Sequence, residues 1–129
     1  MFKDTKTFSS FSTDDLKRAK EFYGTTLGIE TKDNEMGVLE LHLGQGAMGM
    51  IYPKPDHKPA TFTVLNFLVD DVEKAVDKLV AKGVTFEHYD MGEGMKTDEK
   101  GIMKNPDGGS IAWFKDPAGN ILSLISEKK

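Results

Sequence analysis

The chain has 129 residues, of which 38% are apolar and 29% are charged, and its formal net charge is −4. This balance is typical of a globular protein of one domain, and the scattered Lys and Arg residues argue against nucleic-acid binding. The absence of cysteine excludes disulfides, thiol catalysis and thiolate metal sites. No apolar run is long enough for a signal peptide or a membrane span, so we expect a cytoplasmic protein without a membrane partner.

The first half of the chain predicts one helix among several strands. Residues 6–12 favour a strand, and a helix should begin near Asp14 and end at Gly28. Strands are also predicted at 37–43, where leucines alternate with other residues, and at 47–52. The helix should present one apolar face, because four residues recur at helical spacing: Leu16, Ala19, Phe22 and Tyr23.

A proline-rich stretch at 53–60 should link this half to the second, because proline cannot pair within a central strand. In the second half, a strand at 61–69 should precede a helix that Asp70 caps and Gly83 ends. Three more strands are predicted after that helix, at 84–89, 110–115 and 121–126.

The segment 90–109 is rich in glycine, charged, and long for a link between strands. Two interpretations of it stay open. It is either a lid, in which Asp98, Glu99 or Lys100 closes over a ligand, or a solvated excursion of the chain. A short helix capped by Thr97 is expected within it.

The two halves repeat one pattern. The stretch from Ser12 to Ala19 returns as the stretch from Leu68 to Ala75, so that Asp14 and Asp70 lie 56 positions apart. A repeat of this kind indicates a duplicated structural unit. We therefore predict an α+β fold in one domain of residues 1–129. Two tandem β-α-β-β-β modules, at about 5–52 and 61–127, should form a curved mixed sheet with a shared concave cavity.

Two segments carry a resemblance to a known superfamily. FSTDDLKRAKEFYGTTLGIE near the start and WFKDPAGNILSLI near the end resemble the vicinal oxygen chelate superfamily. That group includes glyoxalase I, bleomycin-resistance proteins, extradiol dioxygenases and fosfomycin-resistance enzymes, and the resemblance covers nearly the whole chain. It implies a small organic ligand and a homodimer. In catalytic members it also implies a divalent ion, held by His, Glu or Gln residues from four strands.

The residues at the implied metal positions do not suit a metal. Counted from the shared motifs, these positions fall at Phe8, Gly49, Val64 and Ser123. None of the four is an imidazole or a carboxylate, and we therefore predict no metal cofactor. Glu40 and His42, two positions apart on one strand face, leave open a divalent site rebuilt elsewhere, although a catalytic metal needs about three protein ligands.

The residues expected on the concave face suit binding better than catalysis. The predicted function is therefore metal-free binding of a small organic ligand, as in the bleomycin-resistance branch. The alternative is a glyoxalase-like lyase or isomerase, or a dioxygenase-type enzyme, with Glu40 and His42 as candidates for acid–base catalysis. His57 and His88 should be solvated, and no Ser–His–acid arrangement is recognisable. The predicted ligand-binding residues are Phe8, Ser10, Glu40, His42, Val64, Asn66, Trp113 and Ser123.

Overall fold

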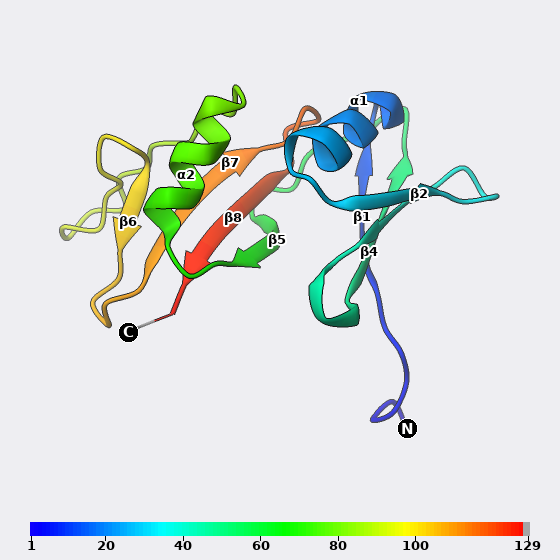
Figure 1. The fold of residues 1–129 in the computed structure, drawn as a ribbon, viewed down its shortest axis with the longest axis horizontal. Coiled ribbons are helices and arrows are strands. Elements are labelled where there is room, and N and C mark those ends of the chain that lie inside the picture. Colours follow the sequence, from blue (N-terminus) through cyan, green and yellow to red (C-terminus); the bar gives the residue numbers. More distant parts are fainter. Residues whose placement is uncertain (128–129) are drawn as a thin grey trace. The chain divides into compact units, whose positions relative to one another are not determined.

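A computed structural model describes residues 1–127 (Figure 1). The chain divides into two compact units, unit one (Met1–Pro59) and unit two (Ala60–Lys129). Each unit contains one four-stranded mixed sheet and one α-helix, which confirms the α+β class and the two tandem β-α-β-β-β modules. Within residues 1–127, no helix has the length and hydropathy that crossing a bilayer requires.

Unit one contains four short strands and a two-part helix. Its sheet has the order β1-β4-β3-β2, with β1 parallel to β4 and the other pairs antiparallel. The strands are β1 (Ser9–Thr13), β2 (Glu30–Asp33), β3 (Leu39–His42) and β4 (Met48–Pro53). The helical segments are α1 (Leu16–Lys20), the π-helix η1 (Glu21–Thr26) and the 3-10 turn η2 (Gly44–Gly46). Residues 1–8 extend away from this sheet and are exposed (Figure 1).

The helix of unit one begins at a capping aspartate and ends at a glycine with a positive φ. The Asp15 side chain accepts a hydrogen bond from the backbone N–H of Arg18 at 3.1 Å, which satisfies a donor that the first helical turn leaves unpaired. At the other end, Gly28 adopts a φ of 71°, which glycine tolerates better than any residue with a side chain. The predicted helix limits near Asp14 and at Gly28 are therefore confirmed.

The core of unit one lies between its helix and one face of its sheet. Leu39 and Leu41 of β3 and Ile51 of β4 are fully buried there. The Tyr23 ring is also fully buried and lies 6.0 Å from the Phe11 ring, measured between ring centroids. Alternation along β3 therefore directs Glu40 and His42 to the opposite face of the sheet.

Unit two repeats this topology with longer elements. Its sheet has the order β5-β8-β7-β6, with β5 parallel to β8. Its helix lies across β7 and β8 (Figure 1) and buries Val76 against a core that includes Phe114 and Leu122. The elements are β5 (Thr63–Leu68), α2 (Val72–Ala81), β6 (Ile102–Lys104), β7 (Ser110–Lys115) and β8 (Ile121–Ser126).

The helix cap of unit two differs by one residue from the prediction. Asp71, not Asp70, is the N-cap residue, and its side chain accepts from the Lys74 backbone N–H at 3.1 Å. Two consecutive aspartates make the two positions equivalent in sequence, so that the pattern alone does not distinguish them. Gly83 follows the helix with a φ of 93°, as predicted.

Three predictions about short segments are wrong. Residues 84–89 are not a continuous strand, because their pairing with β7 is an isolated bridge between Phe86 and Phe114, next to which Glu87 N–H donates to the Trp113 carbonyl. The second strand of the module is instead β6, which lies inside the predicted loop 90–109. The expected helix at Thr97 is a turn, in which the Asp98 side chain accepts from two backbone N–H groups, those of Lys100 and Ile102.

Unit one contains a strand that the sequence pattern did not indicate. Residues Glu30–Asp33 form β2, an edge strand of four residues without an apolar alternation. Short polar edge strands are common in natural sheets because they resist pairing with other chains. Such a strand leaves no periodic signal in the sequence.

Candidate functional site

Six of the eight predicted ligand-binding residues lie on sheet faces that the helix of the same unit does not cover. We call these the helix-free faces. Because residues paired across neighbouring strands point to the same side of a sheet, the strand register identifies the side chains of each face. On the first sheet, one row consists of Ser10, Met50, Glu40 and Lys32, and the next includes Met48, His42 and Glu30. On the second sheet, one row consists of Asn66, Ser123 and Trp113.

An imidazole between two carboxylates is the main polar feature of the first helix-free face. His42 Nε2 lies 3.1 Å from Glu40 Oε1, and His42 Nδ1 lies 3.8 Å from Glu30 Oε2. Only 17% of the Glu40 side chain is exposed, against 82% of Glu30. The tautomer of His42 that carries its proton on Nε2 can therefore donate to Glu40, whereas Glu30 lies beyond hydrogen-bond distance of Nδ1. This group can hold and transfer a proton on the sheet surface.

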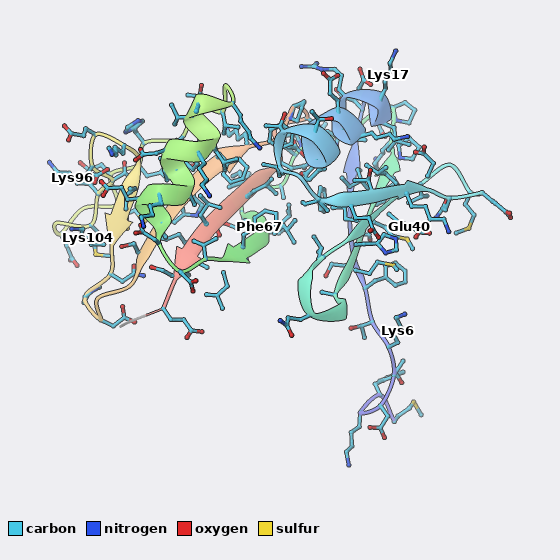
Figure 2. The ribbon with its side chains drawn as sticks, viewed as in Figure 1. Lys6, Lys17, Glu40, Phe67, Lys96 and Lys104 are labelled. Carbon is cyan, nitrogen blue, oxygen red and sulfur yellow. The ribbon has the colours of Figure 1, made fainter. Side chains whose placement is uncertain are left out.

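A cleft opens beside Glu40 on the first sheet. Its volume is about 560 Å³, and Glu40 and Met50 form part of its wall. Figure 2 shows Glu40 among the side chains of this sheet. The remaining wall comes from β2 and the turn after it: Lys32, Asp33, Asn34, Glu35 and Met36. The cleft thus combines a partly buried carboxylate with two thioether side chains, a composition that suits an amphipathic small molecule.

Of the predicted ligand-binding residues, the two nearest the N-terminus are Phe8 and Ser10, and only Ser10 lies within a strand. Phe8 precedes β1 and has 58% of its surface exposed. Ser10 is in β1 and is exposed, opposite Met50 in the strand register. The structure therefore brings Ser10 into the row of Glu40, whereas Phe8 lies outside the strand.

A partly buried hydrogen bond and an aromatic pair characterise the second helix-free face. Ser123 is fully buried, and its hydroxyl donates to Asn66 Oδ1 at 2.5 Å. The Trp113 ring contacts the Tyr89 ring edge-to-face, with centroids 5.3 Å apart and an interplanar angle of 73°. Phe114, the neighbour of Trp113, points to the helix side and is fully buried. Trp113 is therefore the aromatic residue that faces away from the helix.

The surroundings of Tyr89 affect its acidity. Burial raises the pKa of the Tyr89 hydroxyl above its ordinary value, and the negative charge of Glu87 raises it further. The positive charge of Lys115 opposes this shift, and its Nζ lies 3.5 Å from Glu87 Oε1. Tyr89 therefore stays a neutral hydroxyl at physiological pH and can donate or accept a hydrogen bond.

Val64 lies where the second sheet is irregular. The pairing of β5 with β8 passes from Thr63 opposite Ile121 to Leu65 opposite Leu122, so Val64 sits at a β-bulge without a partner residue in this register. Val64 is thus not aligned with Asn66 and Trp113. The bulge was not predicted from the uniform alternation of the sequence.

The side chains at the superfamily's metal positions do not fit a divalent ion. Phe8 and Val64 offer no donor atom, and the Ser123 hydroxyl is engaged with Asn66. Gly49 faces the helix side, next to Leu41, so the helix-free positions of that strand are Met48 and Met50. Among residues 1–127, no group of three or more His, Asp or Glu side chains has metal-binding geometry. The side chains at these four positions therefore do not suit the coordination of a divalent ion.

A second cleft, of about 320 Å³, lies in unit two away from the predicted residues. It is formed at the start of α2 and the ends of β6 and β8, and its lining is strongly acidic. The acidic side chains are Asp70, Asp71, Glu73, Asp98 and Glu127. None of the predicted ligand-binding residues lines it.

Segment 90–109, for which a lid is one of the two interpretations, is linked to α2 by the ion pairs of Lys100. Lys100 Nζ lies 3.2 Å from Asp77 Oδ1 and 3.3 Å from Glu73 Oε2, and both carboxylates belong to α2. Their hydrogen bonds, first that of Asp77 and then that of Glu73, raise the pKa of Lys100. Because α2 covers the opposite face of the sheet, Lys100 lies on the side away from Trp113 and Ser123.

Sequence reasoning missed several residues of these faces. His57 was expected to be solvated, but it is half-buried, and its Nδ1 lies 2.6 Å from the Ser12 hydroxyl oxygen. The contact joins positions 45 residues apart, so no local sequence motif predicts it. Tyr89 and Glu30 were also missed, since neither carries a local signal of contact with Trp113 or His42. His88 is exposed, as expected.

Comparison with known proteins identifies the family. The chain is similar to a lactoylglutathione lyase from Agrobacterium tumefaciens, with 20% identity, a TM-score of 0.70, and coverage of 98% of this chain and 96% of that one. A superfamily member from Sphaerobacter thermophilus has 25% identity and a TM-score of 0.71, with 95% and 98% of the two chains covered. The fosfomycin resistance protein FosX from Listeria monocytogenes has 13% identity and a TM-score of 0.67, with 94% and 89% covered.

No curated protein sequence matches the chain. Residues 9–124 match the sequence profile of the Glyoxalase/Bleomycin resistance protein/Dioxygenase superfamily, which spans both modules. The duplicated topology and this match agree. The chain belongs to the Glyoxalase/Bleomycin resistance protein/Dioxygenase superfamily.

Proposed function

We propose that this protein binds a small organic molecule without a metal ion and without chemical change. The observation that carries the proposal is the replacement of metal-ligating side chains by Phe8, Val64 and Ser123 at the positions implied by the superfamily. The fold is retained while its metal ligands are not. Retention of a scaffold without its metal ligands favours sequestration of a ligand over catalysis.

The second helix-free face offers contacts for an aromatic or amphipathic ligand. The Trp113–Tyr89 pair provides a large, rigid apolar surface at little entropic cost. The Asn66–Ser123 pair beside it provides an amide and a hydroxyl in a fixed arrangement. Apolar walls with a few oriented polar groups are the usual composition of small-molecule sites.

Trp113 gives a direct measurement of this binding, because it is the only tryptophan of the chain. Its fluorescence should be quenched saturably by members of a panel of planar aromatic compounds. Substitution Asn66→Ala should weaken the tightest of them about tenfold, the loss of one hydrogen bond to a desolvated ligand. Ser110→Ala, on the same sheet, is the matched control and should leave the affinity unchanged. Failure of every compound to give a saturable signal would contradict the proposal.

Metal independence requires its own test. The protein, purified without chelator, should contain no stoichiometric transition metal by elemental analysis, and dialysis against EDTA should not change ligand affinity. A stoichiometric metal that disappears in both Glu40→Gln and His42→Gln would contradict the proposal, because these residues are the pair from which a site could be rebuilt.

A second candidate function rests on the 3.1 Å contact between Glu40 and His42. A carboxylate and an imidazole in contact can shuttle a proton, the essential step of general acid–base catalysis. The activity to assay is cleavage of lactoylglutathione, the reaction that the name of the Agrobacterium relative denotes. Turnover that falls about 100-fold or more in Glu40→Gln would favour an enzyme over a binder.

The assembly and location of the protein are part of the same proposal. We expect a homodimer in the cytoplasm, as the superfamily resemblance implies. Sedimentation equilibrium of the full chain measures the assembly, and a monomer at all concentrations would contradict it.

A further inference from the structure

We propose that Ser12 and His57 form a nucleophile–base pair that accepts the acyl group of small, activated esters. The pair is separate from the Glu40–His42 pair and from the proposed ligand contacts of unit two. Its hydroxyl oxygen and imidazole Nδ1 lie 2.6 Å apart, well within hydrogen-bonding distance. This juxtaposition of a hydroxyl and a base is the minimal arrangement of nucleophilic catalysis.

The backbone holds the two side chains in place. Ser12 is in β1, and only 9% of its surface is exposed. His57 lies in the turn after β4, which is fastened to β1 because Lys54 N–H donates to the Thr13 carbonyl at 2.9 Å. Within the turn, His57 N–H donates to the Lys54 carbonyl at 2.9 Å. The base is therefore positioned by two backbone hydrogen bonds, so that little reorganisation is needed before reaction.

The environment suits activation of the hydroxyl. In the imidazole tautomer that carries its proton on Nε2, the Ser12 hydroxyl donates to Nδ1. Ser12 is nearly buried and His57 is half-buried, so water competes weakly for this hydrogen bond. Ser12 also lies on the helix-free face of the first sheet, because its neighbour Phe11 points to the core.

The chemical class of the substrate follows from what surrounds Ser12. Tyr52 of β4 is paired with Ser12 in the strand register and therefore points to the same face, with 39% of its surface exposed. Its ring offers an apolar contact for the alcohol portion of an ester. The limited exposure of Ser12 restricts the acyl portion to a short one. The geometry thus points to acetyl or similarly short esters of aryl alcohols.

The proposed reaction has two steps. In the first, Ser12 Oγ bonds to the ester carbonyl carbon, its proton passes to His57 Nδ1, and the bond from that carbon to the alcohol oxygen breaks. The leaving alcohol oxygen takes the proton from the imidazole. In the second step, water bonds to the acyl carbon and gives a proton to Nδ1, the bond to Oγ breaks, and Oγ recovers that proton. The products are a carboxylic acid and an alcohol.

Ser12→Ala, His57→Gln and Ser9→Ala test the proposal with p-nitrophenyl acetate as the probe. The full-length protein should release p-nitrophenol and gain one acetyl group per chain, located at Ser12 by peptide mass mapping. Both Ser12→Ala and His57→Gln should reduce the acylation rate by about 100-fold or more, the usual contribution of a positioned base. Ser9→Ala should react within about twofold of wild type, since it removes an exposed hydroxyl of the same strand that has no part in the pair. Acetylation elsewhere, equal rates in wild type and Ser12→Ala, or no acylation of the folded wild type would overturn the proposal.

A cysteine variant keeps the proposal testable if Ser12→Ala is poorly folded. The thiol of Ser12→Cys should react with iodoacetamide about tenfold faster when His57 is present than in the double variant with His57→Gln, because a neighbouring imidazole favours the thiolate. Circular dichroism should show the same fold for both. Equal rates in two folded variants would show that His57 does not act as a base and would overturn the proposal.

Discussion

The two units have the same strand order and start their helices in the same way, yet their helix-free faces have little in common. Asp15 and Asp71 cap the two helices with equal distances of 3.1 Å, and Gly28 and Gly83 end them with positive φ. In contrast, the central row of the first sheet contains Met50 and Glu40, whereas that of the second contains Ser123 and Trp113. The two units share the residues that determine backbone geometry and differ in the side chains of their helix-free faces.

The turns between the last two strands of each unit show the same principle. In unit one the backbone N–H of Leu43 donates to the Ala47 carbonyl at 3.0 Å, and in unit two that of Asp116 donates to the Asn120 carbonyl at 2.9 Å. A backbone hydrogen bond thus closes both turns, but in unit two a side chain stabilises the turn as well. The Asp116 carboxylate accepts from the Ala118 and Asn120 backbone N–H groups and from the Asn120 side-chain amide.

We expect the largest effect on stability at Asp116, where the turns of the two units differ. Asp116→Ala should lower the free energy of unfolding by about 3 kcal/mol, because it removes three hydrogen bonds at a residue that is 5% exposed. Urea unfolding followed by circular dichroism measures the change. Asp107→Ala, at an exposed turn with one such bond, is the control and should cost less than about 1 kcal/mol. Equal losses in the two variants would show that the Asp116 network contributes nothing special.

The helix-ending glycines should behave as a matched pair. Gly28→Ala and Gly83→Ala should each lower the free energy of unfolding by about 1–2 kcal/mol, since both residues have φ in the left-handed region and open space around the added methyl group. Gly44→Ala is the control, because that methyl group also meets open space and no positive φ is involved. A difference of more than about 1 kcal/mol between Gly28→Ala and Gly83→Ala would mean that the two units do not use these glycines alike.

The two helix caps should also be equivalent, at a smaller scale. Asp15→Ala and Asp71→Ala should each lower the free energy of unfolding by about 1 kcal/mol, the usual value of an N-cap hydrogen bond. The conservative variants Asp15→Asn and Asp71→Asn retain an acceptor and should be nearly neutral in the same urea titration. A much smaller loss at Asp15 would indicate that α1, which continues as a π-helix, does not depend on its cap.

We expect the smallest effect on stability from the ion pairs of Lys100 in unit two. Lys100 has a raised pKa because its ammonium group contacts Asp77 and Glu73. Its stabilising contribution should therefore be complete below the ordinary value of 10.5 and be lost as the pH rises through the higher folded pKa. Lys100→Gln should speed hydrogen exchange at the Ile102 amide at neutral pH and leave global stability almost unchanged, because the pair is exposed. An exchange rate identical to wild type would contradict this role.

Much of the fold could be predicted because its signals are local. The strands β7 and β8 have the predicted limits, 110–115 and 121–126, since apolar residues and a DPAGN turn define them. The failures occur where a segment carries no periodic signal, as in β2 and β6, or where two adjacent residues are chemically identical, as in Asp70 and Asp71. Segment 84–89 alternates like a strand, but its pairing with the sheet is limited to an isolated bridge between Phe86 and Phe114.

The candidate site was predictable in part for a related reason. Alternation alone places Glu40 and His42 on one strand face, and their contact follows from a spacing of two residues. The Asn66–Ser123 bond joins residues 57 positions apart, and the Ser12–His57 contact joins residues 45 apart. Neither could be predicted, because a register shift of one residue would point these side chains to opposite faces.

By itself, the sequence determined the duplicated β-α-β-β-β order, the ends of the helices at Gly28 and Gly83, and the absence of metal-ligating side chains at Phe8 and Val64. These properties depend on residue type and on spacing along the chain, so no distant contact is needed to define them. Only the tertiary structure decided that Trp113 meets Tyr89, that Lys100 is tied to α2, and that His57 reaches Ser12. Those contacts depend on strand register and turn closure, which are fixed by many residues together.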